Sequence, residues 1–130
     1  MLVRDIMTSS VLTLAPDMTL KDAAASLATL GVSGAPVCDA KGECIGVFTK
    51  SDVVGPMGDG HIDLSCPIKS FMTAKPLTVS ANAEVHEAVH VMADQGVHRL
   101  MVLDESGVLV GIVTPMDVLR GISSGKLKLL

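Results

Sequence analysis

The sequence predicts an α/β fold in which one small strand-helix-strand-strand-helix (β-α-β-β-α) unit occurs twice in tandem. Three observations carry this prediction. The chain repeats itself at a shift of 65 positions (72 minus 7, from Met7 to Met72). Within each copy, apolar residues follow first the period of a helix and then that of strands. The 130 residues, 48% of them hydrophobic, suffice for one domain or for two half-domains that share a core.

The repeat continues without a gap over roughly fifty residues. The matching residues are Met7-Thr8 with Met72-Thr73, Leu12-Thr13 with Leu77-Thr78, Ala23 with Ala88, Gly31-Val32 with Gly96-Val97, Val37 with Val102, Asp39 with Asp104, Gly42 with Gly107, Gly46 with Gly111, Thr49 with Thr114 and Asp52-Val53 with Asp117-Val118. We therefore expect repeat 1 at residues 1–55, a linker at 56–67 and repeat 2 at 68–130. A unit that cannot bury its apolar face alone buries it against its twin, so both repeats should form one module.

Repeat 2 displays its elements clearly. Pro76–Val79 is a short extended segment, and Asn82 is the expected N-cap of a helix. The apolar residues of this helix follow the i, i+3, i+4, i+7 spacing and are Val85, Ala88, Val89 and Met92. Gly96 should end the helix. Two strands with a turn between them follow: Arg99–Asp104, Glu105–Gly107 and Val108–Thr114.

Repeat 1 carries the same elements at equivalent positions. They are an extended segment, a helix, a strand, a turn and a second strand, expected at Val11–Leu14, Thr19–Leu30, Ala35–Asp39, Ala40–Glu43 and Cys44–Thr49. Between the repeats lies Gly55–His61, which is rich in turn-forming residues and therefore predicts a linker.

Composition and charge exclude several functions. Phe48 and Phe71 are the only aromatic residues and the net charge is −4 without a basic run, so we expect no nucleic-acid partner. No apolar stretch reaches the roughly 20 residues that span a bilayer, and the N-terminus lacks signal-peptide architecture. We therefore expect a cytoplasmic protein with no membrane partner. Three cysteines without a C-x-x-C spacing predict reduced, buried thiols.

Each repeat closes on the same local pattern, an apolar strand that runs directly into T-x-x-D. The pattern occupies Gly46–Asp52 and Gly111–Asp117. The threonine hydroxyl can cap a helix, and the helix N-terminus offers free N–H groups and the positive end of its dipole to an anion. The aspartate one turn later can accept hydrogen bonds from two vicinal hydroxyls. This combination suits a ribose joined to a phosphate.

The T-x-x-D pattern is also a helix-capping box, with no ligand involved. Thr19–Asp22 is a third example, at the start of a helix where no ligand is expected. Capping alone therefore remains an alternative. The recurrence of the motif at equivalent positions, after a glycine and two apolar residues, favours the ligand interpretation.

With these residues the chain resembles a cystathionine-β-synthase (CBS) domain pair, also called a Bateman module. The similarity runs from about Val3 to Arg120 and includes Asp5–Thr8, Gly31–Val37, Gly46–Asp52, Phe71–Thr73, Gly96–Asp104 and Gly111–Asp117. The resemblance implies a stand-alone module of two β-α-β-β-α repeats packed sheet to sheet about a pseudo-twofold axis, with clefts between them, that pairs into homodimers. It implies no required cofactor. The implied ligand is an adenosyl nucleotide, with AMP, ADP or ATP favoured over S-adenosylmethionine or NAD(H).

The resemblance also implies which residues contact the ligand. Asp52 and Asp117 are expected to hold ribose hydroxyls, and Thr49 and Thr114 should lie near ribose or phosphate. The adenine of one cleft is expected among Thr13, Leu14, Ala35, Pro36 and Val47. The adenine of the other is expected among Thr78, Val79, Leu100, Met101 and Ile112. Aliphatic side chains would sandwich the base while backbone groups read its hydrogen-bonding edge.

The two repeats differ where charge matters. Repeat 2 has His98-Arg99, and similar pairs in the family reach the ligand phosphates, whereas repeat 1 has Ser33-Gly34 there. A charge-assisted bond from arginine to phosphate contributes roughly 1.5–3 kcal/mol, about ten- to hundredfold in affinity. We therefore expect unequal sites. The alternative role for Arg99 is a solvated strand-end residue that pairs with a surface carboxylate.

The segment His86–His90 reads H-E-x-x-H, the helical zinc-protease signature. On a helical wheel both histidines lie beside the core stripe, at the boundary with solvent, and no third ligand is obvious. We therefore expect no catalytic residue and no metal site.

The sequence thus predicts a non-enzymatic, regulatory module for energy or metabolite sensing, which acts in trans on an unknown partner or on its own oligomer. One alternative is a ligand-free dimerisation or assembly module, with its clefts filled by Met116 and by Met101, which stands where repeat 1 has Pro36. A remote alternative is a zinc hydrolase that uses His86-Glu87-Ala88-Val89-His90.

Overall fold

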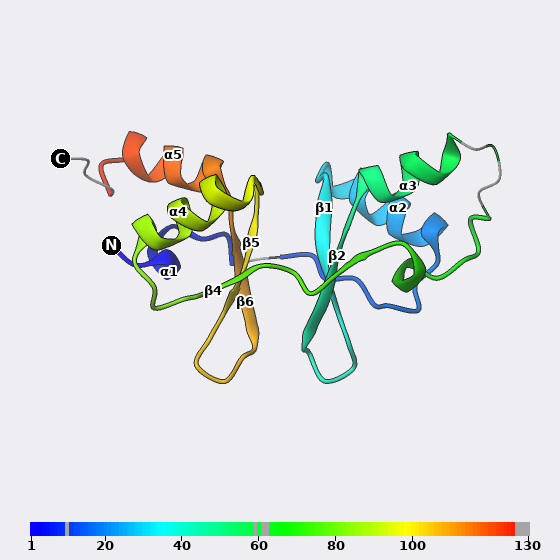
Figure 1. Cartoon of the computed structure of the whole chain (residues 1–130), viewed down its shortest axis with the longest axis horizontal. Coiled ribbons are helices and arrows are strands. Elements are labelled where there is room, and N and C mark those ends of the chain that lie inside the picture. The colour runs from blue at the N-terminus through cyan, green and yellow to red at the C-terminus, as the bar shows by residue number, and fades with distance from the viewer. Residues whose placement is uncertain (10, 59, 61–62, 127–130) are drawn as a thin grey trace. The chain divides into compact units, whose positions relative to one another are not determined.

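The computed structural model describes residues 1–9, 11–58, 60 and 63–126. Ser10, three residues of the predicted linker (Asp59, His61 and Ile62) and the end of repeat 2 (127–130) lie outside the described residues. The chain divides into two compact units, unit 1 with Met1–Val11 and Leu77–Leu130 and unit 2 with Leu12–Pro76 (Figure 1). Each unit combines one three-stranded sheet with helices, so the predicted α/β class is confirmed.

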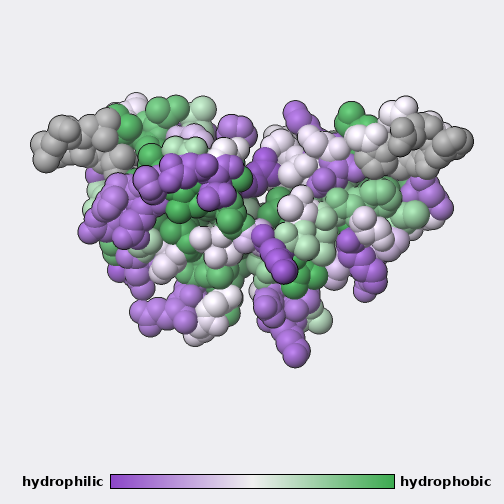
Figure 2. All heavy atoms as spheres, in the orientation of Figure 1, coloured by the Kyte–Doolittle hydropathy of each residue, from purple (hydrophilic) through white to green (hydrophobic). Residues whose placement is uncertain are grey.

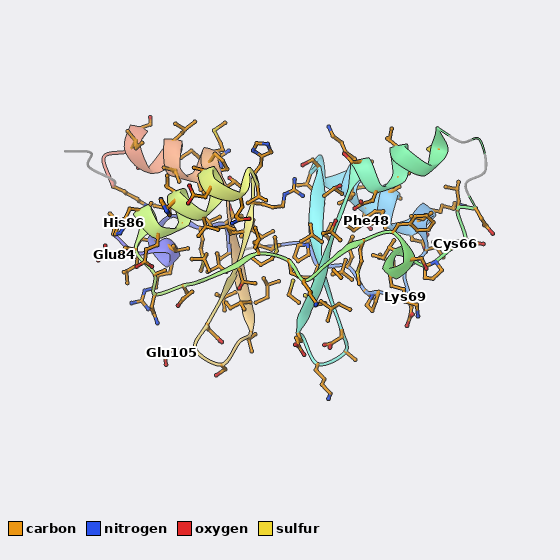
Figure 3. The ribbon with its side chains drawn as sticks, in the orientation of Figure 1. Phe48, Cys66, Lys69, Glu84, His86 and Glu105 are labelled. Atoms are coloured by element: carbon orange, nitrogen blue, oxygen red, sulfur yellow. The ribbon has the colours of Figure 1, made fainter. Side chains whose placement is uncertain are left out.

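Unit 2 holds the sheet β1-β2-β3. Strands β1 (Gly34–Cys38) and β2 (Cys44–Thr49) form an antiparallel hairpin, and β3 (Thr73–Ala74) pairs with β2. The helical elements are α2 (Leu20–Leu30), α3 (Lys50–Met57) and the 3-10 helix η1 (Ile68–Ser70). The core of the unit consists of Leu14, Leu20, Ala23, Leu27, Ala35, Val37, Phe48 and Ile68. Phe48 projects from β2 toward the helices (Figure 3).

Unit 1 holds the sheet β4-β5-β6. Strand β4 (Thr78–Ser80) runs parallel to β5 (Leu100–Leu103), which forms an antiparallel hairpin with β6 (Leu109–Val113). The helices are α1 (Val3–Ile6), α4 (Val85–Gln95) and α5 (Pro115–Ser123), and α4 and α5 lie side by side (Figure 1). The core of the unit consists of Val3, Ala81, Ala88, Met92, Leu100, Val102 and Val113.

Helix α4 differs from the prediction at two residues. Its N-cap is Glu84 and not Asn82, whose side-chain amide instead donates to Glu105 Oε1 at 3.3 Å. Val89 is 40% exposed and so does not belong to the buried stripe, which comprises Val85, Ala88 and Met92. The predicted stop is confirmed, because Gly96 adopts a left-handed backbone (φ 65°) at the C-cap.

The sequence repeat and the compact units do not share a boundary. Thr8, from the start of repeat 1, pairs with Ile112 of repeat 2, and the two residues exchange N–H···O bonds of 2.9 Å. Thr73, from the start of repeat 2, pairs in the same way with Val47 of repeat 1. Each repeat therefore gives its first segment to the sheet of the other repeat. The sequence predicted neither this exchange nor the elements α1 and β3.

Two glycines make this exchange sterically possible. A β-carbon at Gly111 would lie 2.7 Å from Met7 Sδ and 2.8 Å from the Thr8 carbonyl oxygen. A β-carbon at Gly46 would meet Met72 Sδ and the Thr73 carbonyl at the same two distances. Only glycine allows the exchanged segment to lie this close to the central strand.

The surface is divided between charged turns and apolar helix faces (Figure 2). The turns of both hairpins are mainly hydrophilic, whereas hydrophobic atoms gather over α5. On α4 and α5 the hydrophobic residues Val89, Met116 and Leu119 are 40%, 52% and 56% exposed. In the described part of the chain, no helix combines the length and the apolar character that crossing a membrane requires.

Candidate functional site

In unit 2 the predicted ligand residues of the central strands are neighbours. Pro36 of β1 pairs directly with Val47 of β2, which pairs in turn with Thr73 of β3. Directly paired residues project from the same face of a sheet, and Thr49, two positions after Val47, shares that face. Thr49 then leads into α3, which carries Asp52 in its first turn. These side chains form a row along one face of the sheet. The row ends at Asp52, the residue predicted to hold the ribose.

Unit 1 repeats this arrangement. Its row runs through the paired residues Thr78, Met101, Ile112 and Thr8. Thr114 follows Ile112 at the N-cap of α5, and Asp117 lies in the first turn of that helix. The structure thus brings together the predicted residues of each repeat that lie on β2, β6 and the helices that follow them.

Several predicted adenine contacts have their side chains in the hydrophobic cores. Leu14, Ala35 and Leu100 are 2%, 1% and 0% exposed and belong to the core clusters, and Val79 packs against one of them. Leu14, Ala35 and Leu100 can therefore offer a ligand only their backbone groups, whereas the Val79 side chain is partly exposed. Thr13 and Thr78 are exposed, whereas Pro36 and Met101 are buried.

Only one oxygen of the Asp52 carboxylate accepts hydrogen bonds from the described residues. Its Oδ2 accepts a 2.8 Å hydrogen bond from the Thr49 backbone N–H and a 3.4 Å bond from the Thr49 hydroxyl. Within the described residues no donor reaches its Oδ1, and the side chain is partly exposed. An ionised carboxylate has about four lone-pair sites, so Asp52 retains acceptor capacity on Oδ1.

In contrast to Asp52, both oxygens of the Asp117 carboxylate accept hydrogen bonds. Its Oδ2 accepts from the Thr114 N–H at 2.8 Å and from the Thr114 hydroxyl at 3.1 Å, which completes a capping box. Its Oδ1 accepts from the Thr8 hydroxyl at 3.1 Å and lies 3.6 Å from Arg120 Nη1. Only 5% of the residue is exposed. The capping interpretation of T-x-x-D is therefore confirmed for repeat 2.

The sequence did not predict that Thr8 and Arg120 would contact Asp117, and these two residues give Asp117 more partners than Asp52 has. Thr8 lies 109 positions from Asp117 and reaches it through the exchanged segment. Arg120 is one turn beyond Asp117, whereas its equivalent in repeat 1 (120 minus 65) is Gly55. The identity of Met7-Thr8 and Met72-Thr73 was a signal for this segment, but a shared motif does not reveal which strand it pairs with.

The cationic residues lie on loops and helix starts. His98 is exposed and Arg99 partly buried, both between α4 and β5. In repeat 1 the first helical residue of α3 is the exposed Lys50, where repeat 2 has Pro115. Each repeat therefore places a cation near the strand-to-helix end of its row, but on a different element.

The H-E-x-x-H histidines each pair with a neighbouring carboxylate. His86 Nδ1 lies 3.1 Å from Glu84 and His90 Nε2 lies 2.9 Å from Asp94, all four side chains being more than half exposed. Figure 3 places Glu84 and His86 together at the start of α4. In the part of the chain that the structure describes, no group of three or more His, Cys, Asp or Glu residues is arranged to hold a metal ion.

Comparison with protein families identifies both halves of the chain. The family model described as "CBS domain" matches residues 3–57 and again residues 68–124. A curated relative, an uncharacterized protein of Methanopyrus kandleri, is 32% identical over 118 residues, which are 90% of this chain and 58% of that protein. The chain spans 40% and 27% of two further uncharacterized relatives from Methanocaldococcus jannaschii.

Solved structures share the fold over nearly the whole chain. The crystal structure of CBSX2 in complex with AMP has a TM-score of 0.84 at 25% identity and covers 97% of this chain and 98% of its own. Hypoxic Response Protein I with two coordinated zinc ions has a TM-score of 0.81 at 29% identity and covers 92% of this chain and 98% of its own.

Proposed function

Because the chain belongs to the CBS domain family, we propose that it is a regulatory module that binds an adenosyl nucleotide and acts in trans on a partner protein or on its own oligomer. The observation that carries the proposal is the carboxylate of Asp52 at the N-terminus of α3, whose Oδ1 receives no hydrogen bond from the described residues. A carboxylate in this position accepts hydrogen bonds from the two hydroxyls of a ribose, while the helix end attracts the phosphate.

The ligand we favour is AMP, ADP or ATP over S-adenosylmethionine or NAD(H). CBSX2, at 25% identity, is described in complex with AMP, which supports a mononucleotide. Lys50 in repeat 1 and Arg99 in repeat 2 are positive groups suited to a phosphate, and His98 beside Arg99 can donate a hydrogen bond to it. Pro36 and Val47, paired side by side, are the aliphatic residues that we assign to the adenine of repeat 1.

The two repeats are proposed to bind unequally, with repeat 1 as the principal site. Asp117 would have to release Thr8 or Arg120 before it could accept ribose hydroxyls, because both of its oxygens already have partners. Breaking hydrogen bonds to a buried charge costs roughly 1.5–3 kcal/mol each, which subtracts directly from ligand affinity. Among the described residues, Asp52 has no partner on Oδ1 that a ribose would have to displace.

Signalling is proposed to follow from this binding. A nucleotide on Asp52 would connect β2 to the start of α3 and favour one arrangement of the strand-to-helix turn. The resulting population shift is limited by the difference in ligand affinity between the two states. The downstream partner would recognise the favoured state.

The direct test is isothermal titration of the purified protein with AMP, ADP, ATP, NADH and S-adenosylmethionine. We expect saturable binding of at least one adenine mononucleotide, and weaker binding of S-adenosylmethionine, which lacks a phosphate. No heat from any of these ligands at high protein concentration would contradict the proposal and favour the assembly-module alternative.

The second candidate function is a dimerisation module, and one observation favours it. An apolar groove of about 490 Å3 runs between α4 and α5 and is lined by residues that include Val89, Val97, Pro115 and Leu119. Met116 is 52% exposed and therefore does not fill a cleft as the assembly alternative expected. We propose that a second copy of the chain covers this groove, because exposed apolar faces of this kind mark protein interfaces. Dimerisation and nucleotide binding are compatible.

A further inference from the structure

Cys38 and Cys44 face each other across the β1–β2 hairpin. They are paired residues in the antiparallel register, at the position where the ladder shifts between Val37 and Cys38. The Cys38 N–H donates to the Leu14 carbonyl at 2.9 Å, away from β2, and the next pair, Asp39 and Glu43, shares an N–H···O bond of 3.0 Å. A pair beside a hydrogen-bonded pair is non-hydrogen-bonded, the type in which side chains approach most closely.

The two thiols are neighbours on directly paired residues. The Cys44 thiol lies 3.6 Å from the Gly46 carbonyl oxygen, and burial together with the neighbouring Cys44 raises the pKa of the Cys38 thiol. Both residues are reduced and partly exposed, so a small reagent can reach them. The Cα and Cβ separations of a non-hydrogen-bonded strand pair fall close to the ranges that a disulfide requires.

Repeat 2 offers an internal comparison at the same place. Leu103 pairs with Leu109 across the β5–β6 hairpin, with a register shift at the equivalent position between Val102 and Leu103. The fold therefore accepts two aliphatic side chains here and does not itself require cysteine. The thiol pair is a property of repeat 1 alone.

We propose that Cys38 and Cys44 are a two-thiol oxidation site that closes to a cross-strand disulfide by exchange with a small disulfide such as oxidised glutathione. The Cys44 sulfur, after losing its proton, attacks one sulfur of the small disulfide, forms a mixed disulfide and releases one glutathione thiolate. The Cys38 sulfur, after losing its proton, then attacks Cys44 Sγ and expels the second glutathione thiolate. The two protons pass to the two thiolates, so two protein thiols are oxidised and one small disulfide is reduced to two thiols.

The cross-link would fix the register of the hairpin at its bulge. Strands β1 and β2 carry Pro36 and Val47 and lead to Thr49, so the oxidised form holds this part of the sheet more rigidly. The disulfide is expected to form with or without nucleotide.

Peptide mapping tests the site, because Lys41 and Lys50 place the three cysteines in three different tryptic peptides, 22–41, 42–50 and 51–69. The folded full-length protein is treated with oxidised glutathione, blocked with N-ethylmaleimide and digested without reductant. We expect peptides 22–41 and 42–50 as one linked species whose mass falls by two hydrogens relative to their sum and which separates on reduction. Cys66→Ser should leave this species unchanged, and Cys38→Ala should abolish it.

The same oxidation in concentrated urea is the control for geometry. In the unfolded chain, links that include Cys66 should appear beside the Cys38–Cys44 link, whereas the folded protein should give the Cys38–Cys44 link almost alone. The proposal is overturned if the folded protein yields only glutathione or N-ethylmaleimide adducts on the separate peptides. It is equally overturned if the folded protein gives the same mixture of links as the unfolded chain.

Discussion

At the scale of single residues, identical side chains in the two repeats have different environments. Asp52 and Asp117 occupy equivalent positions in T-x-x-D, and each accepts a 2.8 Å hydrogen bond from the backbone of its threonine. Thr8 and Arg120 add partners to Asp117 alone. We infer that Asp117 contributes mainly to stability and Asp52 mainly to recognition, since a carboxylate with all its acceptor sites engaged has little left for a ligand.

The close contacts at two glycines give a first prediction at this scale. Gly46→Ala should lower the free energy of unfolding by about 1–3 kcal/mol, because its β-carbon would lie 2.8 Å from the Thr73 carbonyl oxygen, which cannot swing away like a flexible side chain. Urea denaturation measures this change. Gly55→Ala is the matched control, because a β-carbon at this position inside α3 would meet no atom within 4 Å. It should stabilise the protein by about 0.5–1 kcal/mol, and equal effects at both positions would contradict the packing argument.

The Cys38 thiol gives a second prediction, for its reactivity with pH. Burial first, and then the neighbouring Cys44 and Asp39, raise the pKa of Cys38 from 9.0 to about 11. A raised pKa means that the reactive thiolate forms only at higher pH. The alkylation rate of peptide 22–41 by iodoacetamide should therefore still be rising steeply at about pH 10 in the folded protein. In urea-unfolded protein the rate should reach half its maximum near the ordinary pKa of 9.0 and level off about one pH unit higher. Superimposable profiles would disprove the effect of the folded environment.

At the scale of elements, the exchanged first segments determine how each sheet is completed. β3 enters the sheet of repeat 1 and the segment around Thr8 joins β6 of repeat 2, although each comes from the start of the other repeat. In unit 1 this segment also brings Val3, which is fully buried, into the core. Neither repeat is therefore complete without residues from its twin.

Removal of one hydroxyl tests the contribution of the exchanged segment in unit 1. Thr8→Val keeps the shape of the side chain but removes the 3.1 Å hydrogen bond to the buried Asp117, so the free energy of unfolding should fall by about 1–3 kcal/mol. Thr73→Val is the equivalent change in unit 2, where the threonine is exposed and the structure gives it no bond to Asp52. Its effect should stay within about 0.5 kcal/mol. Chemical denaturation measures the free energy of unfolding of both variants. An equal decrease in the two would show that the Thr8–Asp117 hydrogen bond does not stabilise the fold more than other contacts do.

The sequence predicted local elements well and long-range pairing poorly. The strand Cys44–Thr49 has the expected bounds, and Thr19 caps α2 by accepting a 3.1 Å bond from the Asp22 N–H. Such features depend on a few neighbouring residues. Asn82 is not the N-cap, because α4 begins only at Val85 after Glu84, and the Asn82 side chain bonds to Glu105. The Thr8–Asp117 contact depends on a pairing between distant segments, which hydrophobic periodicity does not record.

At the scale of the whole molecule, the same fold is used twice with different surfaces. Repeat 2 carries the apolar groove between α4 and α5, with Leu119 56% exposed at its rim. Repeat 1 carries the thiol pair and the less occupied aspartate, Asp52. Our proposals therefore assign contact with another copy to repeat 2 and ligand recognition to repeat 1.

A charge placed in the groove tests the proposed dimer. Leu119→Asp should convert the dimer to a monomer, because the new carboxylate would be buried without a partner in the interface. Sedimentation velocity reports the change directly. Val108→Asp is the control, since Val108 is similarly exposed, at 47%, but lies in the turn of the β5–β6 hairpin. Wild-type protein that is monomeric at high concentration, or a Leu119→Asp variant that remains dimeric, would refute the assignment.

In our proposal, Asp52 holds the ribose while Asp117 supports the fold. The measurement that tests it most directly is the titration of AMP into Asp52→Ala and Asp117→Ala, with the thermal stability of each variant recorded beside it. We predict that Asp52→Ala loses about ten- to hundredfold in affinity with a small change in stability. Asp117→Ala should be clearly less stable yet bind AMP at repeat 1 with nearly unchanged affinity. Loss of binding in Asp117→Ala but not in Asp52→Ala, with both variants folded, would contradict the account.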